Sequence, residues 1–131
     1  MVPDQRELHP DVVRFVEERI ESVPHLEALL LLCESAAASW TVDQVAARLY
    51  VSVDRAQAIL DDLRKQDLAR SERIDATLRY RYDTAWDPGG EQMKRIGEAY
   101  RRQLARVATL IHARASTAVR DFARAFVIKK E

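Results

Sequence analysis

The side chains that most often carry chemistry are few and scattered in this sequence of 131 residues. One cysteine, Cys33, stands inside an apolar run, where it is best explained as a small core residue. Three histidines, His9, His25 and His112, lie far apart along the chain. Metal sites built from Cys and His usually show their ligands at short, clustered spacings, and no such cluster is present. We therefore expect no metal site and no other cofactor.

Paired acidic residues do not indicate acid–base catalysis either. Glu17-Glu18 and Asp61-Asp62 are adjacent in the sequence, so on a helix the two side chains of each pair point to different parts of the surface. They are better explained as solubilising charge than as a catalytic pair. The sequence also lacks a glycine-rich phosphate loop and a nucleophile elbow. We therefore expect that the protein is not an enzyme.

Arginines alternate with apolar residues in one short segment, TLRYRY. On a strand this alternation places Leu78, Tyr80 and Tyr82 on one face, and Arg79 and Arg81 on the other. The tyrosine face would pack against the core of the protein. The arginine face could bind phosphate, or it could be an ordinary solvated strand face, and the sequence leaves both interpretations open.

The composition is that of a globular chain, with 47% hydrophobic and 32% charged residues. The length suits one compact domain with an attached element. The longest apolar stretch, residues 28–33, is too short to cross a bilayer, and the first residues do not resemble a signal peptide. We therefore expect a cytoplasmic protein without a membrane partner.

Charge is unevenly distributed, although the formal net charge is zero. Residues 1–69 carry 7 basic and 13 acidic side chains, whereas residues 70–131 carry 14 basic and 8 acidic ones. Such asymmetry can mark a surface for a polar partner, or it can draw together the two halves, or two copies, of the chain.

Helical periodicity predicts four helices in the first half of the chain. The first spans about residues 10–22 and is stopped by Pro24, and the second, apolar almost all round, spans about 25–38. Thr41 begins a capping box for a short third helix, and Ser52 caps the fourth. The inner face of the fourth helix comprises Val53, Ala56, Ile59, Leu60 and Leu63.

In the second half of the chain the spacing of the apolar residues changes from helical to strand-like. Residues 68–74 and 77–82 read as two strands of a hairpin, and Asp87-Pro88-Gly89-Gly90 separates them from a helical tail. An apolar stripe at spacings of three and four predicts a helix of about six turns from Glu91 onward. It comprises Met93, Ile96, Tyr100, Leu104, Val107 and Ile111. A last amphipathic helix is expected over about residues 119–126.

The stripe is longer than a domain core of this size requires. Symmetric dimers are the commonest oligomers of soluble proteins. We therefore predict that the stripe is buried in the interface of a homodimer.

The order of elements from about Leu26 to Tyr82 resembles the winged helix-turn-helix domains of bacterial transcriptional regulators such as the MarR and PadR families. The stretch AQAILDDLRKQDLA, from Ala56 to Ala69, is similar to their recognition helix running into the first strand of the wing. Asp67 stands where these families usually have glycine, but aspartate tolerates a left-handed backbone. The helical tail resembles the dimerisation helices that often follow such domains.

This resemblance implies a mainly α fold with a small β-hairpin wing. Its parts would be an N-terminal helix (1–24), a winged helix-turn-helix domain (25–86) and a C-terminal helical extension (91–131). The partner that it implies is double-stranded DNA, with the fourth helix in the major groove and the wing on the flanking backbone. The implied contacts are base reading by Arg55 and Gln57, phosphate binding by Thr41 and Ser52, and a wing lined by Arg70, Arg73, Arg79 and Arg81.

Two hypotheses follow for function. The first is a homodimeric, DNA-binding transcriptional regulator. Asp54, Asp61 and Asp62 lie on the helix that would approach a polyanion, and they favour the second, a winged-helix module that binds another protein and not DNA. A continuous basic face containing Arg55 and the wing would support the first hypothesis, and an acidic fourth helix with its arginines turned inward would support the second.

Overall fold

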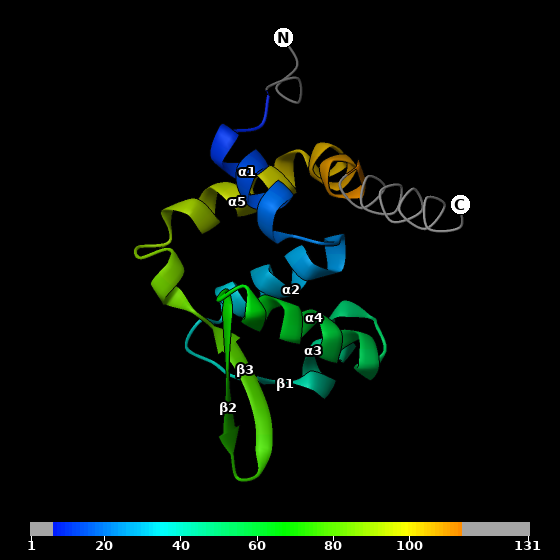
Figure 1. The fold of residues 1–131 in the computed structure, drawn as a ribbon, viewed down its shortest axis with the longest axis vertical. Helices are drawn as coiled ribbons and strands as arrows, with labels where there is room; N and C mark the ends of the chain where they lie inside the picture. The colour runs from blue at the N-terminus through cyan, green and yellow to red at the C-terminus, as the bar shows by residue number, and fades with distance from the viewer. Residues whose placement is uncertain (1–6, 114–131) are drawn as a thin grey trace, which may run out of the picture.

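A computed structural model describes residues 7–113, which form a helical body and one small antiparallel sheet. Figure 1 shows the hairpin of β2 and β3 projecting at one end of the molecule, with α1 and α5 near the other. The predicted mainly α fold with a β-hairpin wing is therefore confirmed. In chain order the elements are α1 (Pro10–Arg19), α2 (Val23–Glu34), β1 (Trp40–Thr41), α3 (Val42–Leu49), α4 (Val53–Lys65), β2 (Ala69–Ile74), β3 (Thr77–Tyr82), the 3-10 helix η2 (Thr84–Trp86) and α5 (Glu91–Arg102).

Pro24 lies at the junction between α1 and α2, but its role differs from the one expected. Helix α1 ends three residues early, because Ile20 already has an extended backbone with φ −115°. Pro24 does not stop a helix. It lies in the first turn of α2, where the missing N–H is not needed for a helical hydrogen bond. Helix α2 therefore begins two residues before the predicted start, and it ends at Glu34 instead of residue 38.

The helix-turn-helix forms where the capping residues predict it. The Oγ1 atom of Thr41 accepts a hydrogen bond from the Gln44 N–H at 3.2 Å, and the Gln44 side chain accepts one from the Thr41 N–H at 3.0 Å. Ser52 caps α4 through a 3.1 Å bond from the Arg55 N–H to its Oγ atom. Asp67, which follows α4, has a left-handed backbone with φ 59°, as the sequence predicts.

The core is centred on α2, α4 and the inner face of the sheet. Fully buried side chains of α2 include Leu26, Leu29 and Leu32. The predicted inner face of α4 is buried as expected at Ala56, Ile59, Leu60 and Leu63. Val53 is the exception, with 49% of its surface exposed, because it occupies the first turn of the helix, which extends beyond the core.

The sheet contains a strand that the sequence did not predict. The strand order is β1-β3-β2, and the two-residue strand β1 pairs Trp40 with Tyr80 and Thr41 with Arg79. A segment this short shows no alternation that could reveal it. The predicted tyrosine face of β3 is confirmed, because Tyr80 and Tyr82 are buried.

The turn of the hairpin contains a strained residue. Asp75 and Ala76 have φ angles of 51° and 66°, the left-handed pair typical of a tight hairpin turn. Aspartate tolerates this region, whereas alanine is strained there by its Cβ atom. We expect Ala76→Gly to raise the free energy of unfolding by about 0.5–1 kcal/mol. Urea unfolding would measure this.

The matched control for this change is Ala58→Gly on the exposed surface of α4. A glycine there should lower the free energy of unfolding by about 1 kcal/mol, because Ala58 lies in a regular helix. If both glycine variants were destabilised alike, the left-handed turn at Ala76 would be contradicted.

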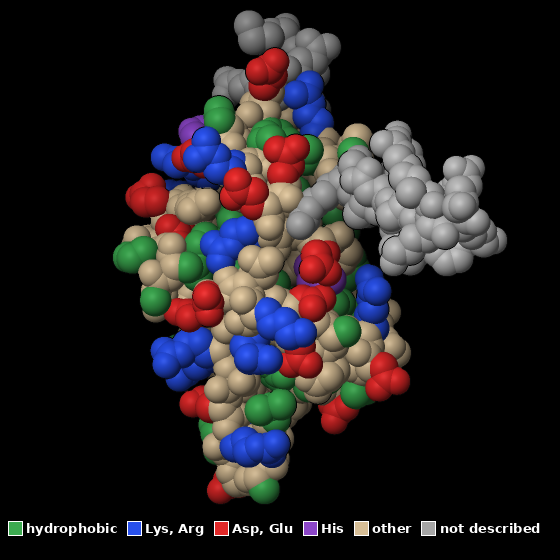
Figure 2. Space-filling model, in the orientation of Figure 1, with side chains coloured by type: hydrophobic (Ala, Val, Ile, Leu, Met, Phe, Trp, Pro, Cys, Tyr) green, Lys and Arg blue, Asp and Glu red, His purple; other side chains and the backbone are tan. Residues whose placement is uncertain are grey.

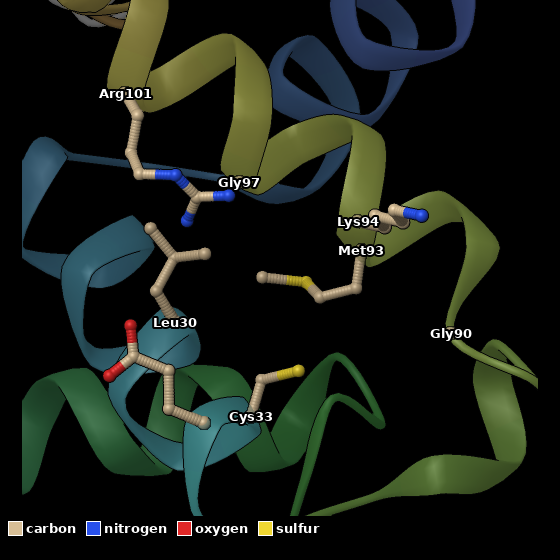
Figure 3. A pocket seen from close by; sticks show the side chains of 8 residues that line it. Leu30, Cys33, Gly90, Met93, Lys94, Gly97 and Arg101 are labelled. Atoms are coloured by element: carbon tan, nitrogen blue, oxygen red, sulfur yellow. The ribbon is translucent and has the colours of Figure 1, made fainter.

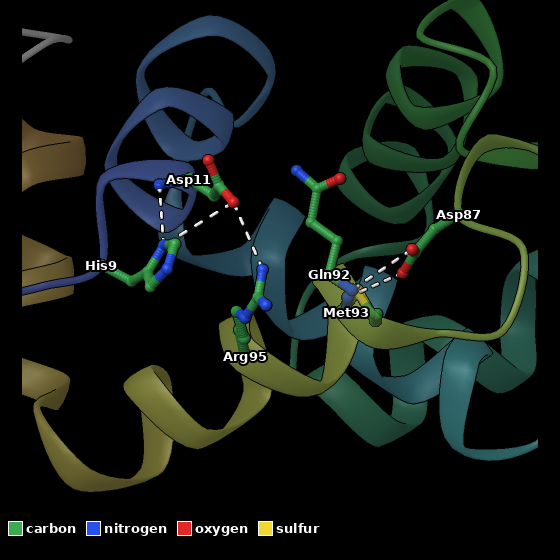
Figure 4. A network of polar contacts seen from close by, with 6 residues as sticks. All are labelled: His9, Asp11, Asp87, Gln92, Met93 and Arg95. Carbon is green, nitrogen blue, oxygen red and sulfur yellow. Dashed lines mark hydrogen bonds and ion pairs between the residues drawn. The ribbon is translucent and has the colours of Figure 1, made fainter.

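The break at residues 87–90 also caps α5. The buried carboxylate of Asp87 accepts hydrogen bonds from the N–H groups of Gln92, at 3.2 Å, and Met93, at 2.8 Å (Figure 4). The same view shows Arg95 of α5 paired with Asp11 of α1 at 3.3 Å. This ion pair joins the acidic and basic halves of the chain.

The prediction of one continuous helix from Glu91 was wrong. Helix α5 ends at Arg102, because Gln103 leaves the helical region with φ −131° and ψ 46°, and helix resumes over residues 104–113. The break lets both segments pack on the same core, so Met93, Ile96, Val107 and Ile111 are all buried. The amphipathic helix predicted over 119–126 lies outside the described residues.

Within residues 7–113, every helix is too short or too polar to span a lipid bilayer.

Candidate nucleic-acid interface

The first turn of α4 presents an exposed polar and cationic surface. Ser52 and Arg55 are both exposed, and the Arg55 guanidinium forms no hydrogen bond or ion pair with another residue of the described range. Thr41, at the start of α3, is half-buried and keeps its hydroxyl on the capping bond. The Arg55 guanidinium is therefore available to bind a base. The hydroxyls of Thr41 and Ser52 lie at the starts of α3 and α4, so a phosphate could contact them only there.

The same surface carries an aromatic residue that the sequence reading passed over. Tyr50, between α3 and α4, is 94% exposed and has a left-handed backbone with φ 57°. A bulky side chain in this backbone region is uncommon and marks a constrained turn. Val53, in the first turn of α4, is a second exposed apolar side chain near this junction in the sequence. The position of Tyr50 in a three-residue connection gave no periodic signal by which to find it.

Gln57 is engaged inside the protein. Its Nε2 atom donates a hydrogen bond to the hydroxyl oxygen of Tyr80 at 2.7 Å, and the Tyr80 hydroxyl donates to Oδ1 of Asp61 at 2.7 Å. Burial, and then the bond to the Asp61 carboxylate, raise the pKa of Tyr80, so its hydroxyl stays protonated as a donor. This chain of bonds ties α4 to β3. The base-reading role expected for Gln57 therefore conflicts with the observed contacts.

The acidic residues of α4 are likewise held by protein donors. Asp61 is bound by Tyr80, and Oδ2 of Asp62 lies 2.9 Å from Nε2 of His25 in α2. Both carboxylates are half-buried on the flanks of the helix. They are therefore not free acidic groups on the surface that would face DNA, and Asp54, in the first turn, remains as an exposed acid there.

The register of the wing decides which arginines share a face. Arg70 pairs directly with Arg81, and Glu72 pairs with Arg79, so these four side chains lie on one face of the hairpin. Arg73 pairs with Leu78 on the opposite face. Of the four arginines expected to line the wing, three therefore share one face, and Glu72 stands among those three.

The wing arginines differ in the contacts that their guanidinium groups make with the rest of the chain. The Arg79 guanidinium donates to the backbone oxygen of Ser39 at 3.3 Å, and Arg81 donates to that of Ala37 at 3.0 Å and lies 3.8 Å from the Glu72 carboxylate. Arg70 and Arg73 are exposed and have no such partner among the described residues. Figure 2 shows basic side chains along the hairpin end of the molecule with acidic ones among them. The surface seen there is mixed in charge, not continuously basic.

A pocket of about 230 Å³ lies between α2 and α5 (Figure 3). Leu30, Cys33 and Met93 line it together with Arg101. Its volume is below the roughly 300–1,000 Å³ of common small-molecule sites. Burial raises the pKa of the Cys33 thiol and so disfavours the reactive thiolate. These features give no basis for assigning a ligand to this pocket.

Comparison with known proteins finds distant structural similarity. No protein-family model and no curated protein matches the sequence. Among solved structures, the chain is similar to the adhesin competence repressor (AdcR) of Streptococcus pyogenes, at 17% identity over 92% of this chain and 90% of that chain, with a TM-score of 0.49. A variant of Lactococcus lactis ZitR shows 13% identity over 100% of this chain and 81% of that chain, with a TM-score of 0.43.

An ArsR-like transcriptional regulator from Rhodococcus sp. RHA1 shows 24% identity over 78% of this chain and 96% of that chain, with a TM-score of 0.40. None of these likenesses is close enough to carry over the role of any residue. They also do not assign the chain to the MarR or the PadR family.

Proposed function

We propose that this chain is a DNA-binding transcriptional regulator that acts as a homodimer. In this proposal the first turn of α4 enters the major groove, and the wing lies along the flanking phosphates. The observation that carries the proposal is the arrangement of the hairpin, where Arg70 and Arg81 stand directly opposite each other with Arg79 on the same face. Like charges in this position repel each other. Glu72, 3.8 Å from Arg81, offsets part of that repulsion, and an anionic backbone would relieve the rest.

The helix-turn-helix supplies the second part of the argument. Arg55 has an exposed, unpaired guanidinium at the start of α4, and arginine binds guanine through two parallel hydrogen bonds. Tyr80 and His25 hold the side chains of Asp61 and Asp62, so neither carboxylate extends from the first turn of α4, where Arg55 lies, although both keep their negative charge. Base reading in this proposal therefore rests on Arg55, with Gln57 as a structural residue.

The homodimer is proposed on a smaller surface than the sequence suggested. Four of the six stripe residues lie in the chain's own core, whereas Leu104 is 51% exposed and Tyr100 is half-buried. A second copy could therefore reach the stripe at Leu104 and Tyr100. A two-fold contact through this surface would join two copies of the chain, and dimeric helix-turn-helix regulators bind two half-sites on one duplex.

The experiment that tests the proposal measures binding to random genomic DNA fragments at low and moderate salt. We expect binding that weakens steeply with salt, because it depends on phosphate contacts. Arg70→Ala should weaken binding on all fragments alike and reduce the salt slope by about one unit. Arg95→Ala is the control, because Arg95 is on α5 and pairs with Asp11.

Absence of binding by the wild-type protein at low salt would contradict the proposal. The alternative is a protein-interaction module, and one observation favours it. Tyr50, between α3 and α4, and Val53, in the first turn of α4, are exposed apolar side chains that a protein partner could cover.

A further inference from the structure

Three potential metal ligands that are separated in the sequence meet beside α4. Nε2 of His25 lies 2.9 Å from Oδ2 of Asp62 and 3.9 Å from Oε2 of Glu21. The three ligand atoms all lie within 4.8 Å of one another. Glu21 is at the junction of α1 and α2, His25 is in the first turn of α2, and Asp62 is in α4. The cluster therefore joins two parts of the helical body.

The distances suit a first-row transition ion. Zinc binds imidazole nitrogen and carboxylate oxygen at about 2.0–2.2 Å, so neighbouring ligands of a tetrahedral ion are roughly 3.4 Å apart. The two measured separations from His25 Nε2 lie on either side of that value, and small side-chain rotations would equalise them. An imidazole with two carboxylates favours zinc-like ions over magnesium or calcium, which prefer oxygen ligands alone.

The three side chains differ in exposure, so that one ligand is fixed by packing and the other two can be reached from solvent. The His25 side chain is only 8% exposed, whereas those of Asp62 and Glu21 are 34% and 56% exposed. A buried imidazole is held in place by packing, and the two carboxylates lie open to solvent above it. An ion could enter from that side and keep a water molecule as its fourth ligand.

Ser22, whose Oγ atom caps α2 by accepting a hydrogen bond from the His25 N–H at 3.3 Å, also contacts the His25 ring. Its Oγ atom lies 2.5 Å from Nδ1 of His25, on the side of the ring away from the cluster. In one tautomer the ring donates its Nε2 proton to Asp62 and accepts the Ser22 hydroxyl proton at Nδ1. With metal on Nε2, the ring proton resides on Nδ1 and Ser22 Oγ accepts it. Such a hydrogen bond to the other nitrogen is the usual support of a metal-bound histidine.

We propose that Glu21, His25 and Asp62 form a binding site for one divalent zinc-class ion. The two carboxylates balance the charge of the ion, and the imidazole offers Nε2 as the third ligand atom. This proposal departs from the expectation, drawn from the sequence, that the chain has no metal site. Sequence spacing could not reveal the site, because Asp62 reaches it only through the packing of α4 against α2.

The test is a zinc titration of the full, untagged chain in competition with a chromophoric chelator. We expect one ion per chain. His25→Gln should weaken zinc binding by more than about 100-fold, since even second-layer partners of metal ligands commonly contribute roughly 10- to 100-fold. His9→Gln and His112→Gln are matched controls, because both histidines are exposed and lie outside the cluster. They should bind zinc as the wild type does.

A second variant, Glu21→Gln, tests the site even if His25→Gln fails to fold. The Glu21 side chain is 56% exposed and makes the longest contact of the cluster, so its replacement should leave the fold intact while still weakening zinc binding at least tenfold. Zinc should also raise the Tm of the wild type more than that of Glu21→Gln, because an ion that binds only the folded state stabilises it. Wild-type protein that binds no zinc, or variants that bind it as tightly as the wild type, would overturn the proposal.

Discussion

Val107→Asp is expected to unfold the chain, whereas Leu104→Asp is expected to leave it folded. Val107 is 1% exposed and lies in the core with Met93 and Ile96, while Leu104 is 51% exposed. An unpaired carboxylate in an apolar core costs several kcal/mol, a large share of the roughly 5–15 kcal/mol that stabilises a folded domain. Far-UV circular dichroism during urea unfolding would measure both variants.

The same two variants also test whether Leu104 lies in a dimer interface while Val107 lies in the core of one chain. If a second copy binds over Leu104, sedimentation should show that Leu104→Asp dissociates a wild-type dimer into folded monomers. A wild-type protein that sediments as a monomer at micromolar concentration would contradict the homodimer. A fully folded Val107→Asp variant would instead contradict the packing of residues 104–113 on the core.

Arg55→Ala is expected to weaken binding to a selected DNA site by about 1–3 kcal/mol and to relax the preference at one base pair. The reason is the loss of a paired contact to guanine that no other side chain replaces. Competition among fragments that differ at single base pairs would measure both effects. Arg64→Ala is the matched control, because Arg64 is an exposed arginine in the last turn of the same helix.

Equal effects of Arg55→Ala and Arg64→Ala would contradict base reading by Arg55 and indicate general attraction to phosphate. Gln57→Ala provides a further contrast. Because Gln57 donates to Tyr80, its removal should lower the free energy of unfolding by about 0.5–1.5 kcal/mol, the usual net value of one hydrogen bond. It should leave base preference unchanged.

Several features that depend on neighbouring residues were predicted correctly from the sequence, although the role of Pro24 was not. The capping box at Thr41 and the cap at Ser52 fixed the starts of α3 and α4, because a hydroxyl satisfies the N–H groups of its own first turn. The alternation of tyrosine and arginine fixed the faces of β3 because a strand turns its side chains to opposite sides. The left-handed Asp67 followed from the conformational tolerance of aspartate.

Features that depend on distant partners were not predicted. Periodicity identified the apolar stripe after residue 91, but it could not show that Gln103 breaks the helix and returns Val107 to the chain's own core. The sequence likewise showed Gln57 and Asp62 as free polar side chains on one helix. Tyr80 and His25, which bind them, are 23 and 37 residues away along the chain. Only the packed structure shows these partners.

Amide hydrogen exchange with and without a bound genomic DNA fragment tests the central claim most directly. The account predicts that DNA slows exchange at the start of α4, around Arg55, and along the hairpin from Ala69 to Tyr82, since groups covered by a ligand lose contact with solvent. Exchange in α5 should be unchanged by the DNA itself. Protection confined to α5, or no DNA-dependent protection in α4 and the hairpin, would contradict it.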